Sequence, residues 1–105
     1  MGGQEHFYME TQGCLVVPKG ESEEMEIVSS TQGVNQVQLR AAKALGISSN
    51  RINVKVKRVG KFYTIYLYLF SYVVCLLYIG GGFGGKETTP CALAVPAAIA
   101  ANKLA

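Results

Sequence analysis

The stretch GGGFGGKE, from Gly80 to Glu87, combines five glycines with one aromatic ring, one cation and one carboxylate. Residues without a Cβ let the main chain approach a ligand and direct N–H groups at its oxygen atoms. Phe83 is bulky enough to form one wall of a pocket, and Glu87 offers a carboxylate beside it. The stretch therefore indicates a loop that holds a ligand, although a glycine turn without a ligand would have the same composition.

Two nucleotide-binding motifs match this stretch in part. Gly80, Gly82 and Gly85 satisfy G-x-G-x-x-G, but the acidic residue expected about twenty positions later would fall at the end of the sequence. Gly80 and Gly85-Lys86 also match the start of a P-loop, where Glu87 replaces the hydroxyl that binds magnesium. A carboxylate there would repel phosphates, so an NAD- or ATP-binding module rests on glycine spacing alone.

Composition narrows the class of protein. A chain of 105 residues that is half apolar, with a net charge of +3, corresponds to one small domain or a piece of a larger one. Its basic residues form no continuous face, so no nucleic-acid partner is expected. Cys14, Cys75 and Cys91 are widely spaced and His6 is the single histidine, which predicts neither a disulfide framework nor a metal site made of side chains. Reduced thiols and the lack of a secretory signal favour the cytoplasm.

The elements that must position the loop follow from the spacing of apolar residues. Residues 5–17 suit extended structure with a turn, residues 18–24 a polar connection, and Met25–Ser29 a short strand. Apolar residues then recur at spacings of three and four up to Leu45, which predicts a helix that Gly46 ends in a left-handed cap.

Two further elements are expected on either side of the glycine loop. Ile52, Val54 and Val56 alternate with polar residues, the period of a half-buried strand. Residues 90–104 are rich in alanine and predict a helix that Pro96 interrupts or kinks. The expected order is strand, helix, strand, glycine loop and helix.

The run FYTIYLYLFSYVVCLLYI, residues 62–79, contains eighteen residues without a charge. This length is at the lower end of what a membrane-spanning helix requires, and tyrosines near both ends could lie at the membrane interfaces. A small single-span membrane protein is therefore an alternative reading of the chain.

The motifs GGQEHFYMET, VKRV and GGGFGGKET resemble the first molybdopterin-binding region of the xanthine dehydrogenase and aldehyde oxidase family. The resemblance covers nearly the whole chain apart from the apolar run. It implies an α+β fold, as an incomplete fragment of the molybdopterin-binding domain in which a strand-helix-strand unit is followed by the glycine-rich loop and a helix.

The resemblance also assigns roles to single residues. Gln4 matches a glutamine whose side chain approaches an oxygen of the molybdenum, and Phe83 with Gly84 match a pair whose main chain lines the metal and the pterin. Glu87 matches the glutamate that orients a purine substrate in xanthine dehydrogenases. Aldehyde oxidases usually carry an apolar residue there, so a purine hydroxylase is favoured over an aldehyde oxidase fragment. Thr89 departs from the arginine that is frequent at its position.

By the same resemblance, the molybdenum is held by the pterin dithiolene and not by side chains. The family hydroxylates purines or other N-heterocycles with oxygen from water, and its full-length members are homodimers that also carry 2Fe-2S clusters and FAD. The regions that bind those two cofactors have no counterpart in this chain. The chain alone is therefore expected to be inactive, and no membrane association is expected of the family.

Residues 61–79 interrupt the family pattern at its tightest loop and divide the partial domain into residues 1–60 and 80–105. Without these residues and one flanking glycine, the chain reads KRVGGGFGGKET. The codons of Gly60-Lys61 can contain the intron donor GTAA, and those of Ile79-Gly80 can contain an acceptor AG. A helical insertion would separate its flanks by about 27 Å, which no cofactor loop accommodates. We interpret the run as a translated intron, with the membrane span as the alternative.

Overall fold

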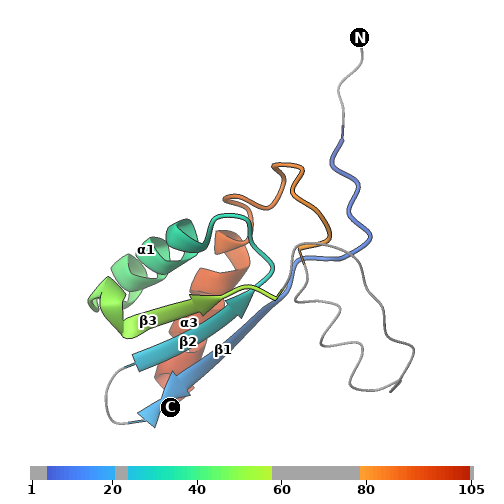
Figure 1. Ribbon diagram of the computed structural model, residues 1–105. Helices are drawn as coiled ribbons and strands as arrows, with labels where there is room; N and C mark the ends of the chain where they lie inside the picture. The colour runs from blue at the N-terminus through green and yellow to red at the C-terminus, as the bar shows by residue number, and fades with distance from the viewer. Residues whose placement is uncertain (1–4, 21–23, 58–78, 105) are drawn as a thin grey trace.

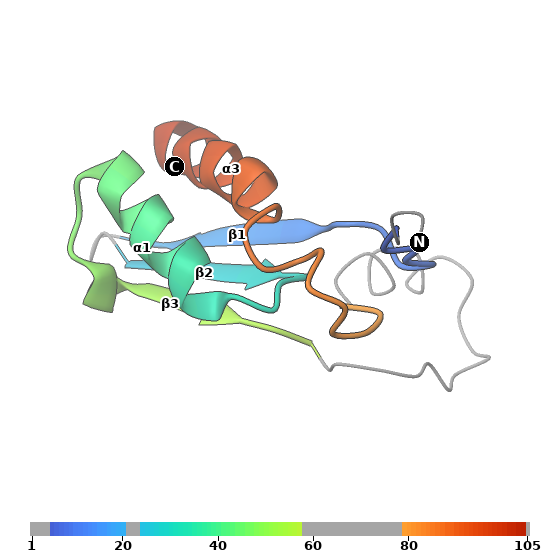
Figure 2. The ribbon, with the colours of Figure 1, turned by 90° about the horizontal axis from the view of Figure 1, so that it is seen from above.

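The structure, a computed structural model, describes residues 5–20, 24–57 and 79–104. Its elements are, in chain order, β1 (Cys14–Lys19), β2 (Glu24–Ser29), α1 (Val34–Leu45), the short 3₁₀ helix η2 (Ser49–Arg51), β3 (Ile52–Lys55) and α3 (Cys91–Leu104). The strands form one sheet in the order β1-β2-β3. Both helices cover the same face of this sheet (Figures 1 and 2), α1 over β3 and α3 over β1. The expected α+β fragment is confirmed.

The predicted strand-helix-strand unit is β2-α1-β3. β2 and β3 are parallel, with Met25 opposite Ile52 and Ile27 opposite Val54. A parallel pair needs a crossover connection, and α1 supplies it. The helix ends as the sequence predicts, because Gly46 adopts φ 70° and ψ 21°, the left-handed conformation that glycine accepts without a Cβ clash.

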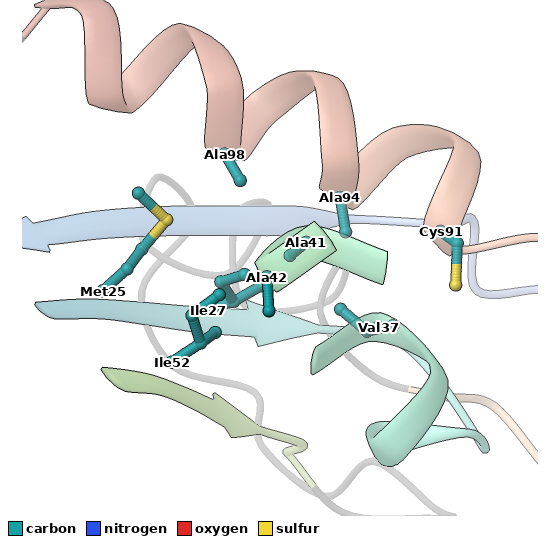
Figure 3. Close-up of a cluster of buried hydrophobic side chains, with 9 residues drawn as sticks. All are labelled: Met25, Ile27, Val37, Ala41, Ala42, Ile52, Cys91, Ala94 and Ala98. Carbon is teal, nitrogen blue, oxygen red and sulfur yellow. The ribbon is translucent and has the colours of Figure 1, made fainter. Parts of the chain in front are cut away.

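The core lies between the sheet and the two helices. Nine buried side chains form it, as Figure 3 shows: Met25, Ile27, Val37, Ala41, Ala42, Ile52, Cys91, Ala94 and Ala98. The larger members come mainly from the strands, whereas α3 contributes alanines and a cysteine. Small residues let helices approach closely, so the alanine-rich composition of α3 serves its packing against α1.

The structure differs from the sequence-based expectation at several element ends. Glu24, expected in the connection, begins β2, and Val56, expected in the last strand, follows the end of β3 at Lys55. Pro18 and Lys19 were expected in the connection but belong to β1, where Pro18 pairs with Met25. Proline is tolerated on an edge strand, since its missing N–H costs no hydrogen bond when that side faces solvent. α3 begins at Cys91, one residue later than expected, and the Pro90 carbonyl accepts the Ala94 amide at 2.9 Å. The helix continues through Pro96 to Leu104.

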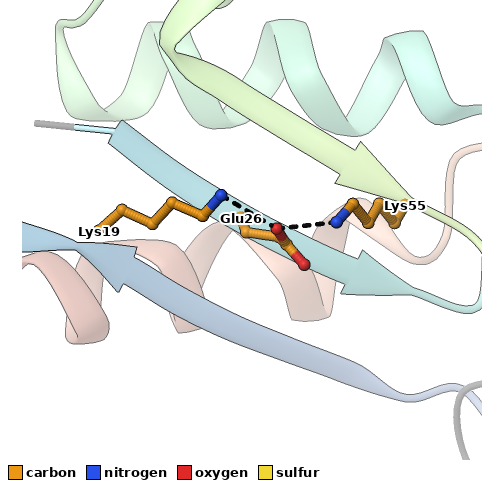
Figure 4. Close-up of polar contacts among 3 residues, drawn as sticks. All are labelled: Lys19, Glu26 and Lys55. Carbon is orange, nitrogen blue, oxygen red and sulfur yellow. Dashed lines mark ion pairs between the residues drawn. The ribbon is translucent and has the colours of Figure 1, made fainter.

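The face of the sheet opposite the helices carries a charged group on each strand. On β2, the Glu26 carboxylate lies 2.9 Å from Lys55 Nζ on β3 and 3.3 Å from Lys19 Nζ on β1 (Figure 4). The hydrogen bond from Lys55, followed by that from Lys19, holds the pKa of Glu26 below its usual value. These contacts link all three strands on the open face.

A helix that crosses a membrane must be both long and apolar. In the described parts of the chain, no helix has both properties. The run 62–79 lies outside the described residues except for Ile79, whose side chain is buried.

Cys14 should be a slow nucleophile. Burial against the core raises the pKa of its thiol from 9.0 to about 11, which lowers the thiolate fraction at pH 8 roughly a hundredfold. We expect alkylation by iodoacetamide to slow by about that factor relative to the guanidinium-unfolded chain, in a Cys75→Ser, Cys91→Ala background. The folded state keeps this proton longer, so the associated stability is complete below pH 9 and falls between pH 9 and 11. Equal rates for folded and unfolded chain would contradict the prediction.

Candidate functional site

The glycine loop (Gly80–Glu87) lies beside the N-terminal segment (Glu5–Gly13), and Lys86 joins the two (Figure 1). Lys86 Nζ donates to the main-chain carbonyls of Glu10 at 2.9 Å, Thr11 at 3.3 Å and Ile79 at 2.9 Å. The side chain is only 1% exposed. Lysine is almost never buried to this extent unless its charge is satisfied, and here three carbonyl oxygens satisfy it.

Tyr8 contacts both the Lys86 amine and the main chain of the glycine loop. Lys86 Nζ lies 4.5 Å from the centre of the Tyr8 ring, a cation–π geometry. The Gly85 amide donates to the Tyr8 hydroxyl oxygen at 3.1 Å. A Cβ at Gly85 would lie 2.9 Å from Tyr8 Cε2 and 3.2 Å from His6 Cβ, so a larger residue would require the Tyr8 ring to move.

Gln32, in the turn between β2 and α1, holds the loop from the other side. Its Oε1 accepts from the Gly84 amide at 3.1 Å, from the Lys86 amide at 3.3 Å and from the Tyr8 hydroxyl at 3.4 Å. The amides of residues 84–86 therefore bond within the chain. Gly82 and Phe83, which directly precede them, are exposed residues.

The carbonyl of Lys86 closes the same network. It accepts from the Gln32 amide at 2.7 Å and from the Thr31 hydroxyl at 3.2 Å. Gly33 follows Gln32 in the turn and allows the loop to come close to it, because a Cβ at Gly33 would lie 2.6 Å from the main-chain oxygen of Glu87. The turn before α1 and the last residues of the loop are thus in direct contact.

Burial and the charge of Glu10 shift the pKa of the Lys86 amine in opposite directions. Desolvation lowers the pKa of its amine below 10.5, and the negative charge of Glu10 partly offsets that shift. A lowered folded-state pKa means that the charged amine is disfavoured by folding. Stability linked to Lys86 therefore rises as the pH increases through the folded pKa toward 10.5.

The predicted site residues occupy the outer side of this network. Phe83 is 60% exposed, and its ring centre lies 5.5 Å from that of Tyr8. Among the described residues, Phe83 lines a cavity of about 470 Å³ together with Glu5, His6 and Phe7.

Of the other predicted residues, Gly84 has φ 93° and Glu87 is exposed directly after buried Lys86. Gln4 lies outside the described residues, adjacent in sequence to Glu5 in the cavity lining. The structure thus brings Phe83 to the N-terminal segment, and Glu87 does not line this cavity.

Lys86, Gln32 and Tyr8 were not singled out by the sequence pattern. Their contacts between the glycine loop and the first third of the chain join residues 52 to 77 positions apart, and no local period reports such contacts. The one available signal was a lysine at the end of a glycine-rich stretch, which reads equally well as part of a P-loop.

Comparison with known proteins identifies the family. The family model of the molybdopterin cofactor-binding domain matches residues 1–61. Aldehyde oxidase 3 of Mus musculus is 48% identical over 103 residues, and xanthine dehydrogenase of Emericella nidulans is 44% identical over 104. Xanthine dehydrogenase/oxidase of Gallus gallus is 47% identical over 103 residues. These alignments cover 98–99% of this chain but 6% of each relative. The chain belongs to the molybdopterin cofactor-binding domain family of the xanthine dehydrogenases and aldehyde oxidases.

Proposed function

We propose that this chain forms part of the molybdopterin site of an oxidoreductase that hydroxylates purines. The observation that carries the proposal is the contact between the two motifs that the family resemblance assigns to the cofactor. The N-terminal segment and the glycine loop are distant in sequence, yet Lys86, Gln32 and Tyr8 bind them together. Relatives named as xanthine dehydrogenases and aldehyde oxidases support the same reaction class.

The residues present fit a pterin cofactor. The cavity of about 470 Å³ has two aromatic side chains and an imidazole in its lining, which suits a flat heteroaromatic ring. Gly84, an exposed residue without a Cβ, directly follows Phe83 of this lining. In this proposal Gln4, Phe83 and Gly84 hold the cofactor, which, when bound, supplies hydroxylation with oxygen from water.

Glu87 is proposed to orient the substrate. Glu87 is exposed. Lys86, the residue before it, is held by hydrogen bonds of both its side-chain amine and its main-chain amide, so the main chain that leads into Glu87 is fixed in position. A carboxylate at this position can accept a hydrogen bond from a purine N–H group, and in its protonated form it can donate one to a ring nitrogen or oxygen. In the complete protein, 2Fe-2S clusters and FAD would bind elsewhere, and we propose a cytoplasmic homodimer.

A chimera tests this function. Residues 1–59 and 80–105 would replace the matching segment of the Gallus gallus xanthine dehydrogenase/oxidase, with and without Glu87→Gln. The chimera should retain molybdopterin and oxidise xanthine. Because a charged hydrogen bond contributes about 1.5–3 kcal/mol, Glu87→Gln should lower kcat/KM for xanthine roughly 10- to 100-fold and leave an aliphatic aldehyde substrate almost unaffected.

Three results separate the parts of the proposal. A chimera without molybdopterin would contradict the assignment of the cofactor site. Equal losses for xanthine and aldehyde would remove the substrate role of Glu87. Turnover by the isolated 105-residue chain would contradict the expectation that it is inactive alone.

We further propose that residues 61–79 do not belong to the working domain. The family model match ends at residue 61, where the run begins, while the relatives align across 98–99% of the chain. Sequencing transcripts across the codons for Arg58 to Lys86 tests the intron. Messages that all retain the run would favour the single-span membrane alternative, for which resistance to alkaline extraction is the second measurement.

A further inference from the structure

We infer that Lys86 and Gln32 form a latch, defined as these two residues with their hydrogen bonds, that fixes the glycine loop in the position from which Phe83 and Glu87 act. Lys86 is on this view a positioning residue. The significance of the latch for catalysis rests on the proposed function, whereas its existence as a local clamp does not.

The first half of the latch is the Lys86 amine. An ammonium group has three N–H donors, and three main-chain carbonyls accept from it. Two of these belong to Glu10 and Thr11 in the N-terminal segment, and the third belongs to Ile79 at the entrance of the loop. The amine therefore closes the loop on itself across seven positions and ties it to a segment 75 and 76 positions away.

The second half is the Gln32 amide group. It extends from the turn that connects β2 to α1, the two elements that contribute Ile27 and Val37 to the core. Its Oε1 receives two loop amides and the Tyr8 hydroxyl. The loop is thereby attached to the packed part of the domain, and not only to the N-terminal segment.

The two halves act on a short piece of main chain, residues 84–86. Phe83 lies directly before this piece and Glu87 directly after it, and both side chains are exposed. A clamp on residues 84–86 fixes the starting points of both side chains while leaving each free to contact a ligand. Loss of the clamp should therefore loosen the site without unfolding the sheet.

Hydrogen exchange of the full 105-residue chain, read by mass spectrometry, tests the latch. Lys86→Met keeps the length of the side chain but removes its donors and charge. Losing hydrogen bonds to a charged group should accelerate exchange by roughly 10- to 100-fold in peptides covering residues 79–87, where the amides of residues 84, 85 and 86 are hydrogen-bonded, with peptides from β2 unchanged. Lys43→Met, which removes an exposed lysine from α1, is the matched control and should change neither.

Two further variants keep the test decisive. Lys86→Arg retains a cation with N–H donors and should protect the loop better than Lys86→Met. Gln32→Met should accelerate exchange at residues 84–86 while the Lys86 amine remains in place, which decides the matter if Lys86→Met unfolds the chain. Unchanged loop exchange, or acceleration spread equally over β2, would overturn the inference. No cofactor enters these measurements, so a failed chimera would leave their result standing.

Discussion

Deleting residues 60–79 should raise the fraction of the chain that is monomeric in solution. The run 62–79 has eighteen residues without a charge, and exposed apolar surface promotes association between chains. The deletion joins Val59 to Gly80 and restores the sequence KRVGGGFGGKET. Size-exclusion chromatography with light scattering would measure the monomer fraction of the two chains. A deletion variant that aggregates as readily as the full chain would contradict the prediction.

The end point of this deletion can be tested with a second deletion that leaves one more glycine, Gly60, in the chain. In the chain without residues 60–79, Val59 takes the position of Ile79, whose side chain is 2% exposed. Deleting only residues 61–79 places Gly60 there instead and leaves that site without a side chain. Since burying a valine contributes about 1.5–3 kcal/mol, urea denaturation should find the first variant more stable by roughly that amount. Equal stability would show that position 79 has no apolar requirement.

Ile27→Ala should cost about 2–5 kcal/mol of unfolding free energy, because it opens a cavity at the centre of the core. Ile27 is fully buried on the central strand, between the sheet and both helices (Figure 3). Small domains have only about 5–15 kcal/mol in total, so the variant should lose a large fraction of its stability and unfold at a clearly lower urea concentration. Circular dichroism during urea titration of the shortened chain would measure the loss.

The matched control is Leu15→Ala, which removes the same number of carbons from the open face of β1. Leu15 is 45% exposed, so its truncation removes far less buried area and should cost below about 1 kcal/mol. A cost as large as that of Ile27→Ala would mean that the open face is covered, for example by a second copy of the chain.

The strand-helix-strand unit could be predicted because its signals are local. The apolar period of α1, the left-handed glycine at position 46 and the alternation of β3 depend on neighbouring residues, and all three are confirmed. Pro18 was placed in the polar connection because of the polar residues around it, and only the sheet order shows that β1 is an edge strand, which accepts a proline.

The sequence contains a local signal for a loop beside a pocket, but none for the contacts that hold the loop in place. Glycines and Phe83 indicated a loop beside a pocket, and Phe83 does line one. The buried state of Lys86 could not be predicted, because lysine is normally exposed and its acceptors are carbonyls that every residue carries. Gln32 likewise gives no local signal, since its partners lie at the other end of the chain.

The acceptors of the Lys86 amine have an evolutionary consequence. All three are main-chain oxygens, so mutation of Glu10, Thr11 or Ile79 to another residue leaves the acceptor in place. Selection on this contact therefore falls almost entirely on the lysine, and its partners are free to drift as far as their own packing allows. For the same reason, any residue that takes the position of Ile79, including Val59 in the chain without residues 60–79, would still offer a main-chain carbonyl to the Lys86 amine.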